Sequence, residues 1–428
     1  MNIFIWFWTF SEDFIYYQAN IVYEFFQQNW FNMVKDASSA DIIIVVWIPF
    51  TIFEEVKALL TINYYLKKYP NKKIMTIWHL SDMIDWLESF GNLEVIRLSE
   101  LSKLNSLFNH TIPIENIEIE AYRFFIPLKI QELYIVNFWY DINIKTDYRY
   151  TEHDLRITVD NLKKWDYDIS WIQEYDQKYN YLEDITWNLY IQTSYGCWAK
   201  CSYCVINKVW FIKSEPLDKI INTITRWLAS WKKTVYLMDQ DTWSYWLDIW
   251  LDFSALLNAI NKIEWDFKVK IHYIEPWKLG KFYSKIDTSF FEKRLEFVNI
   301  TLVTLSQRIL KLMNRHYDIR SILDIVLDIR RLNKNIKINT DLVYGFPTET
   351  FKEFKEYFHI MKYFDYTTFI LYSEKSGLAL SQIQKNSPQE VYKKYMYYQK
   401  VHKLFPGKIE NSYFLKVEKI ALIVKLLY

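Results

Sequence analysis

The sequence predicts an α/β protein: an N-terminal parallel-sheet βαβ domain followed by an open partial (βα)6 barrel. The first observation is that β-branched runs such as DIIIVVW alternate with longer segments whose large residues recur at helical spacing. The second is that this alternation is weak over residues 131–184 and resumes near Trp187. The third is that about six strand–helix units fit between residues 185 and 404, too few for a closed eight-stranded barrel.

The N-terminal domain is predicted over residues 1–130. Its elements are, in order, a strand in NIFIWF, a helix in FIYYQANIVYEFFQQ, a buried strand in DIIIVVW, an amphipathic helix in EEVKALLTINYYLKK and a strand in KKIMTIW. Residues 131–184, rich in Tyr, Asp and Lys, are predicted to form a connector with local helix. Strands alternating with helices of this length indicate βαβ units and a parallel sheet.

The barrel is predicted over residues 185–404. Strands are expected in WNLYIQTS, KTVYLM, FKVKIHYIEP, FVNITLV, IKINTDLVYGFP and TTFILYS. Helices are expected in LDKIINTITRWLAS, FSALLNAINKI, SQRILKLMNR, SILDIVLDIRRL and FKEFKEYFHIMKYF. Residues 405–428 form a short tail with room for two strands.

Composition and charge indicate a soluble globular protein, with 51% hydrophobic and 24% charged residues. The net charge of +1 argues against a general nucleic-acid binder, so any such contact is expected to be local. No run of about 18 uncharged apolar residues suggests a membrane span, and the first residues lack the features of a signal peptide. A cytoplasmic protein without membrane contact is therefore expected.

Glycine is rare and tryptophan abundant, with 6 Gly and 19 Trp in 428 residues. Average usage of about 7% would give roughly 30 glycines. Several tryptophans stand at turns, where glycine reaches positive φ most easily: Trp30, Trp78, Trp198, Trp210, Trp231 and Trp246. We hypothesise that the source reads UGA codons as Gly and that this sequence was translated with UGA as Trp.

All three cysteines lie in GCWAKCSYC, residues 196–204, directly after a predicted strand. Thiolates bind soft metals and iron–sulfur clusters. A Cys3His zinc site would need His153 or His272 to be brought in by the fold, and three unrelated cysteines would rarely fall so close together. A four-iron cluster held by Cys197, Cys201 and Cys204 would leave one iron open for a substrate or cofactor.

A C-x3-C-x2-C loop after the first strand of a partial barrel resembles the radical S-adenosylmethionine (SAM) superfamily. Further stretches resemble its methylthiotransferase family over nearly the whole chain: the cysteine loop through KSEP, KKTVYLMDQDTWSYWLD, SQRILKLMNRHYD, TDLVYGFPTET and LYSEKSGLAL. The resemblance implies one 4Fe-4S cluster on the three cysteines, SAM on the open iron, and Tyr203 against the adenine. The wording of DQDT and RILKLMNR is nearest the branch that modifies a ribosomal protein, with the tRNA-modifying branches close behind.

Polar residues at other predicted strand ends are candidates for holding the cofactor. The resemblance implies that Asp239 and Gln240 contact its amino group or ribose; a solvated turn or helix cap is the alternative. Arg308 could face the cofactor carboxylate or cap a helix, and Asp341 could be a cofactor contact or structural. Asp241, Glu275 and Gly345 are further candidates of this kind, with Gly345 permitting close backbone approach.

The sequence departs from the family in its N-terminal domain. Methylthiotransferases hold a second cluster there on three cysteines, at positions aligned here with Ser11 or Glu12, Ile48 and His79. The family's C-terminal RNA-binding barrel is also longer than residues 405–428. Two alternatives to a methylthiotransferase therefore stay open: a radical SAM enzyme without sulfur insertion, and a non-catalytic metal-binding or interaction protein. The expected partners are a ribosomal protein or tRNA substrate and an electron donor, with the chain as a monomer.

Overall fold

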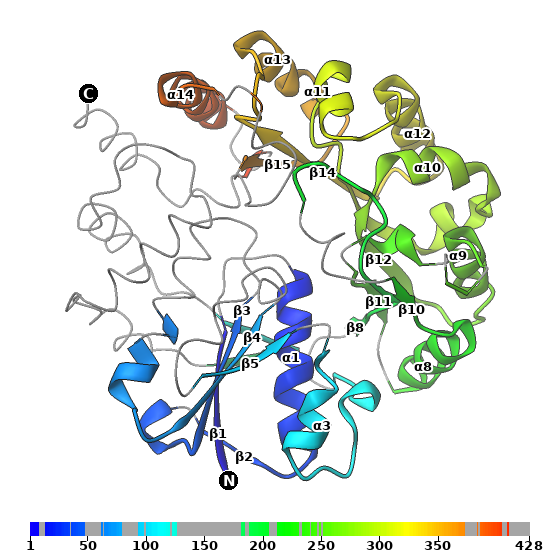
Figure 1. Ribbon diagram of the computed structural model, residues 1–428. Helices are drawn as coiled ribbons and strands as arrows, with labels where there is room; N and C mark the ends of the chain where they lie inside the picture. The colour runs from blue at the N-terminus through cyan, green and yellow to red at the C-terminus, as the bar shows by residue number, and fades with distance from the viewer. Residues whose placement is uncertain are drawn as a thin grey trace. The chain divides into compact units, whose positions relative to one another are not determined.

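The computed structural model describes parts of both halves of the chain (Figure 1). The described residues are 1–7, 13–34, 36–47, 61–62, 64–78, 93–97, 100–119, 122–125, 181–184, 188–204, 212–230, 233–239, 241–245, 248–249, 251–372, 383, 386–404 and 409–410. The chain is divided into two compact units, residues 1–185 and residues 186–428. Within the described residues, no helix has the length and apolar character needed to cross a membrane.

The first unit contains a five-stranded parallel sheet with strand order β2-β1-β3-β4-β5. Its strands are β1 (Asn2–Phe7), β2 (Asn32–Met33), β3 (Ile42–Trp47), β4 (Lys73–Trp78) and β5 (Leu93–Arg97). The main described helix is α1 (Asp13–Gln28), with shorter turns at η1 (Ala37–Ser39), α3 (Lys103–Leu107) and η5 (Ile114–Asn116). A separate antiparallel pair joins β6 (Tyr122–Phe125) to β7 (Tyr181–Asp184). The predicted parallel sheet is confirmed.

Helix α1 ends at a residue in the left-handed conformation. Trp30 has φ 66° and is 91% exposed, and the amide of Phe31 donates to the carbonyl of Phe26 at 3.0 Å. This is the usual way in which a glycine terminates a helix. A tryptophan gains no burial there and adopts a strained backbone, as expected for a position that suits glycine.

The second unit contains a parallel sheet with strand order β16-β15-β14-β13-β12-β11-β8. Its strands are β8 (Asn188–Ile191), β11 (Thr234–Leu237), β12 (Lys268–Ile274), β13 (Leu295–Ile300), β14 (Lys337–Tyr344), β15 (Tyr366–Leu371) and β16 (Ile409–Glu410). A short antiparallel pair, β9 (Ser194–Tyr195) with β10 (Lys213–Ser214), lies beside the cysteine loop. From β8 to β15 the neighbouring strands follow chain order, as in an open (βα)6 barrel.

Helices connect the strands of the second unit. They are α8 (Leu217–Ala229), α9 (Phe253–Asn261), α10 (Pro276–Phe282), α11 (Gln307–Leu312), α12 (Ile319–Leu332), α13 (Phe351–Glu356) and α14 (Pro388–Leu404), with shorter or irregular turns at η6 (Thr242–Ser244), η7 (Tyr283–Lys285), η8 (Phe290–Arg294) and η9 (Tyr357–Lys362). The predicted long helix over FKEFKEYFHIMKYF is divided between α13 and η9. Helices α10 and α14 were not predicted.

Helix α12 shows why these segments take their places. Asp318 caps it by accepting a hydrogen bond from the Ser321 amide at 2.8 Å. Ile322, Val326 and Ile329 recur at helical spacing and are buried. Burying each such side chain contributes about 2 kcal/mol, which outweighs the modest helix propensity of β-branched residues.

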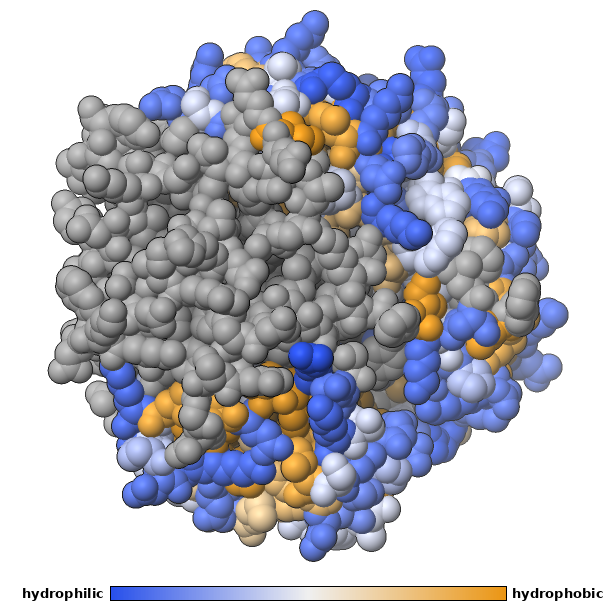
Figure 2. Space-filling view, viewed as in Figure 1, coloured by the Kyte–Doolittle hydropathy of each residue, from blue (hydrophilic) through white to orange (hydrophobic). Residues whose placement is uncertain are grey.

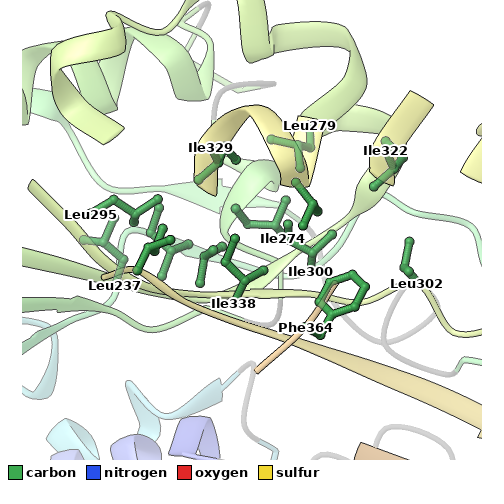
Figure 3. Close-up of a cluster of buried hydrophobic side chains, with 14 of the residues drawn as sticks. Leu237, Ile274, Leu279, Leu295, Ile300, Leu302, Ile322, Ile329, Ile338 and Phe364 are labelled. Atoms are coloured by element: carbon green, nitrogen blue, oxygen red, sulfur yellow. The ribbon is translucent and has the colours of Figure 1, made fainter. Parts of the chain in front are cut away.

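The core lies between this helix layer and one face of the sheet. Figure 3 shows Leu237 of β11, Ile300 of β13 and Ile338 of β14 in one cluster with side chains of α10 and α12. On the visible side in Figure 2, hydrophilic residues cover much of the described outer surface of the second unit. The helices therefore present apolar side chains to the sheet and polar ones to solvent.

The opposite face of the sheet is polar and aromatic. Successive strand side chains point to opposite faces, so Tyr236 and His272 point away from their apolar neighbours Leu237 and Ile271. The Tyr190 and Tyr236 rings stack with centroids 5.4 Å apart, and the Tyr236 hydroxyl lies 3.3 Å from His272 Nδ1. A parallel sheet with a polar face has room for chemistry at the carboxyl ends of its strands.

Candidate active site

The cysteine loop begins at the carboxyl end of β8, and Asp239 holds its first turn. The Asp239 carboxylate, at the end of the neighbouring strand β11, accepts hydrogen bonds from the amides of Thr193 at 3.0 Å and Ser194 at 2.8 Å. It also accepts one from the Thr193 hydroxyl. Burial raises the pKa of Asp239 to about 7, although these hydrogen bonds favour the ionised form. Asp239 thus binds the backbone that leads into the loop, and its contact with a cofactor stays a prediction.

Cys197 lies against a buried polar group formed by Asp241, Ser244 and Lys278. The Cys197 thiol donates to Asp241 Oδ2 across 3.7 Å, and Lys278 Nζ lies 2.5 Å from the same oxygen. Ser244 Oγ donates to that oxygen at 2.7 Å and accepts from the Trp198 amide at 3.1 Å. Burial raises the pKa of Cys197, Asp241 raises it further, and Lys278 opposes the shift.

Lys278 reaches Asp241 because of the way α10 begins. Glu275, the last residue before the helix, accepts a hydrogen bond from the Trp277 amide at 3.2 Å, and Pro276 occupies the first helical position. This turn places Lys278 in the first turn of α10 at the end of β12, where its side chain is fully buried. Burial lowers the pKa of Lys278, but attraction by Asp241 and Cys197 raises it by more.

Cys201 lies against a second buried ion pair. Burial raises the pKa of the Cys201 thiol, and the nearby Arg315 and Tyr203 side chains oppose the shift. Arg315 Nη2 lies 3.3 Å from Glu275 Oε1, and Arg315 Nη1 donates to the Thr301 carbonyl at 2.8 Å. Burial raises the pKa of Glu275 to about 6, with Arg315 opposing the shift. The predicted cofactor residue Tyr203 therefore lies beside the second cysteine.

The segment after α11 clamps the middle of the cysteine loop. The Ser202 amide donates to the Met313 carbonyl at 3.0 Å, and Ser202 Oγ donates to the Leu312 carbonyl at 2.6 Å. Asn314 Nδ2 donates to the Lys200 carbonyl at 2.6 Å, from a residue with φ 56°. Asparagine tolerates this left-handed conformation better than most residues. The loop is thus held by hydrogen bonds to backbone carbonyls, and none of these bonds uses a thiol.

Asp341 lies on β14, in contact with the neighbouring strand. Asn299 Nδ2 donates to Asp341 Oδ2 at 2.8 Å, and burial raises the pKa of Asp341 to about 6. Gly345, which follows β14, has φ 76°, and its amide donates to Glu349 Oε2 at 2.8 Å. The positive φ agrees with the backbone role expected for Gly345.

Arg308 is bound to α13 and the turn before it. Its Nη2 lies 2.7 Å from Glu353 Oε2 and donates to the Thr348 carbonyl at 2.8 Å. The Arg308 side chain is 49% exposed. Arg308 thus ties α11 to the start of α13 without capping either helix, since Ser306 and Thr350 are their caps, and a role toward the cofactor carboxylate stays a prediction.

Other predicted positions fall outside the described residues. They are Gln240, Ser11, Glu12, Ile48, His79, Trp210, Trp231 and Trp246. His272 lies on β12 and contacts Tyr236, while His153 is outside the described residues. Trp198 is 46% exposed and does not have positive φ, unlike Trp30. In the described part of the chain, no three His, Cys, Asp or Glu side chains surround a single ion position.

The donor set and the surrounding polar atoms fit a cluster with a polar cofactor. Three thiols and no fourth cysteine can ligate three irons and leave one open. Within the described residues, buried polar atoms at the carboxyl edge of the sheet have no hydrogen-bond partner: Ser194 Oγ, Thr242 Oγ1, Asn299 Oδ1 and Arg315 Nε. Buried polar atoms are rarely left unpaired. Their position therefore suits a ligand with several polar groups, such as an amino acid joined to a nucleoside.

Sequence reasoning missed Lys278, Arg315 and Asn299 as site residues. Arg315 was visible inside the quoted stretch RILKLMNR, and Lys278 stands three residues after the candidate Glu275. Asn299 carried no signal beyond a polar residue within a predicted strand. Their contacts join segments far apart in the chain and depend on the strand order.

Fold and site together define an α/β protein with a three-cysteine loop at the carboxyl edge of a parallel sheet. Residues 191–361 match the model of the Radical SAM superfamily. Residues 191–361 thus form a radical SAM domain, as the cysteine loop predicted.

The curated relatives include methylthiotransferases of different branches. The tRNA-2-methylthio-N(6)-dimethylallyladenosine synthase of Clostridium botulinum is 29% identical over 54% of this chain and 52% of its own length. The ribosomal protein uS12 methylthiotransferase of Thermosipho africanus is 31% identical over 40% of this chain and 41% of its own. A probable threonylcarbamoyladenosine tRNA methylthiotransferase of Methanocaldococcus jannaschii is 28% identical over 44% of this chain and 45% of its own length.

The family resemblance is confirmed, but over a shorter stretch than the nearly complete chain that was expected. The chain spans about half the length of the curated relatives it matches. Among solved structures, the radical SAM methyltransferase TsrM of Kitasatospora setae is 13% identical, with a TM-score of 0.48 over 86% of this chain and 72% of that one.

Proposed function

We propose that the chain is a methylthiotransferase-like radical SAM enzyme that modifies a ribosomal protein or tRNA in the cytoplasm. The observation that carries this proposal is the cysteine loop after β8, which holds every thiol of the chain and is fastened to the sheet edge by Asp239, Ser244 and Asn314. The named activities of the curated relatives supply the substrate classes.

Cys197, Cys201 and Cys204 would hold the 4Fe-4S cluster, and the unpaired polar atoms around the loop would receive SAM. When bound, the cluster and SAM supply one-electron cleavage of a carbon–sulfur bond and a 5′-deoxyadenosyl radical that abstracts hydrogen. An external electron donor is required, since no other redox group is expected. The chain's own part is to hold the loop, orient the cofactor through Tyr203, Asp239, Gln240, Arg308 or Asp341, and keep water from the carboxyl edge of the sheet.

A second candidate is a radical SAM enzyme that does not insert sulfur. It is favoured by one observation: all three cysteines stand at 197–204, so residues 1–185 offer no thiols for a second cluster. A third candidate, a non-catalytic metal-binding protein derived from the family, would keep the loop but not the chemistry.

Anaerobic reconstitution with iron and sulfide separates these candidates. We expect about four irons per chain, a brown protein, and release of 5′-deoxyadenosine from SAM under a strong reductant. The triple variant C197A/C201A/C204A should hold no cluster and should release no 5′-deoxyadenosine. About eight irons would overturn the single-cluster proposal, and one zinc per chain without SAM cleavage would overturn the radical SAM proposal.

Mass spectrometry of ribosomal proteins and tRNA from a deletion strain identifies the substrate. Loss of a methylthio group would support the methylthiotransferase. Loss of a modification without sulfur would favour the second candidate.

A further inference from the structure

Lys278 is a buried cation with a narrow set of partners. Its side chain is 0% exposed, and that of Asp241 is 5% exposed. Lys278 Nζ lies 2.5 Å from Asp241 Oδ2 and 3.1 Å from Ser244 Oγ. A lysine is almost never fully buried unless it is paired with a negative charge. The buried position of Lys278 therefore depends on its ion pair with Asp241.

Asp241 is the link between Lys278 and the first cysteine. The same oxygen, Oδ2, faces Lys278 Nζ on one side and Cys197 Sγ, 3.7 Å away, on the other. A cysteine that binds iron does so as a thiolate, which has no proton to donate. The contact between Cys197 and Asp241 would then bring two negative groups together in a buried site. Such a contact is costly unless a cation compensates it.

The second ion pair beside the loop is built differently. Burial raises the pKa of Cys201, and Arg315, which also pairs with Glu275, acts directly on that thiol to lower it. A change at Arg315 would therefore alter a thiol contact and a charge together. Among the described residues, Lys278 hydrogen-bonds Asp241 and Ser244 but no thiol, and its charge is therefore the cleaner one to test.

We propose that Lys278 is a positioning residue that sets the reduction potential of the cluster by compensating Asp241 behind Cys197. This inference rests on the proposed function, since it presumes that Cys197 binds a cluster. Charges and hydrogen bonds near the ligands are among the features by which a protein tunes such potentials. The cation stabilises the more negative, reduced form. Its removal makes reduction harder, and removal of Asp241 makes reduction easier.

The test is a potentiometric titration of the reconstituted protein, followed by electron paramagnetic resonance of the reduced cluster. Lys278→Met should lower the midpoint potential by about 59 mV or more. For one electron, this shift corresponds to a tenfold change in the equilibrium constant of reduction. Asp241→Asn should raise it, and Lys278→Arg should stay close to the wild-type value. Opposite signs for the two neutral variants identify charge as the cause, because a merely structural defect would not reverse sign.

The chain offers a matched control in Lys394. Its side chain is 1% exposed and pairs with the fully buried Glu349 at 2.9 Å, and its described partners include no residue of the cysteine loop. Lys394→Met breaks a pair of the same kind and should leave the potential unchanged. If Lys278→Met does not fold, the double variant D241N/K278M replaces it, and its potential should be close to wild type.

The inference would be overturned by an unchanged midpoint potential in Lys278→Met, or by a shift of the same sign in both Lys278→Met and Asp241→Asn. A double variant shifted well away from wild type would also overturn it. A wild-type protein that binds no cluster would instead contradict the proposed function, so the two failures are distinguishable.

Discussion

The side-chain amide of Asn314 donates to the Lys200 carbonyl at 2.6 Å and so fastens the segment after α11 to the middle of the cysteine loop. The two residues are 114 positions apart in sequence. Asn314 has φ 56°, a conformation that glycine adopts freely and alanine does not.

Substitutions at Asn314 should separate the hydrogen bond from the backbone conformation. Asn314→Gly loses the side-chain contacts with the Lys200 carbonyl and with His316 but keeps the backbone conformation, and should cost about 1–2 kcal/mol of unfolding free energy. Asn314→Ala also places a β-carbon at positive φ and should cost about 1 kcal/mol more. Urea denaturation measures both, and iron per chain after reconstitution should fall in both. Equal stability of the two variants would show that the conformation is not strained.

The pH dependence of stability should carry the signature of Asp239. Its pKa is about 7 in the folded chain against an ordinary value of 3.8, so the folded state binds the proton more tightly. The stability from this group is complete below pH about 3.8 and is lost as pH rises through about 7. Relative to Asp239→Asn, the wild type should lose about 3 kcal/mol between pH 5 and pH 8. Parallel pH profiles of the two proteins in urea denaturation would contradict this assignment.

Replacing Trp30 by glycine should stabilise the first unit. Trp30 is 91% exposed at φ 66°, so the substitution removes backbone strain without loss of packing. The expected gain in unfolding free energy is about 1 kcal/mol. Trp265 is the control, since it is 48% exposed without positive φ and Trp265→Gly should give no gain. The codon at position 30 is the genetic check: UGG there would contradict the hypothesis of a UGA read as Gly.

Gly345 and Gly280 should respond in opposite directions to substitution by alanine. At Gly345, with φ +76°, an added Cβ would meet Leu371 Cδ1 at 3.0 Å. Gly345→Ala should therefore destabilise by roughly 1–3 kcal/mol. Gly280 lies inside α10, where an added Cβ would meet Ile322 Cδ1 at an ordinary 3.4 Å. Gly280→Ala should stabilise by up to about 1 kcal/mol because alanine favours the helix. Thermal unfolding of both variants measures the contrast.

Much of the fold followed from local patterns. Continuous β-branched runs predicted β3 and β14, and apolar spacing predicted α8 and α12, because burial on one face imposes these periods. Helix α10 was missed because β12 runs into it without a loop, with Glu275 serving as its cap. Helix α14 was missed because its sequence, rich in Tyr and Lys, lacks a clear apolar stripe.

The sequence by itself determined the class of domain: three thiols at C-x3-C-x2-C spacing, placed after a strand, lie close together through local chain geometry alone. Only the tertiary structure decided which side chains surround that loop. Lys278 and Asp241 are 37 residues apart, and Arg315 is more than 100 residues beyond Cys201. They meet because parallel strands bring their carboxyl ends to one edge of the sheet. Burial there then favours paired charges over isolated ones.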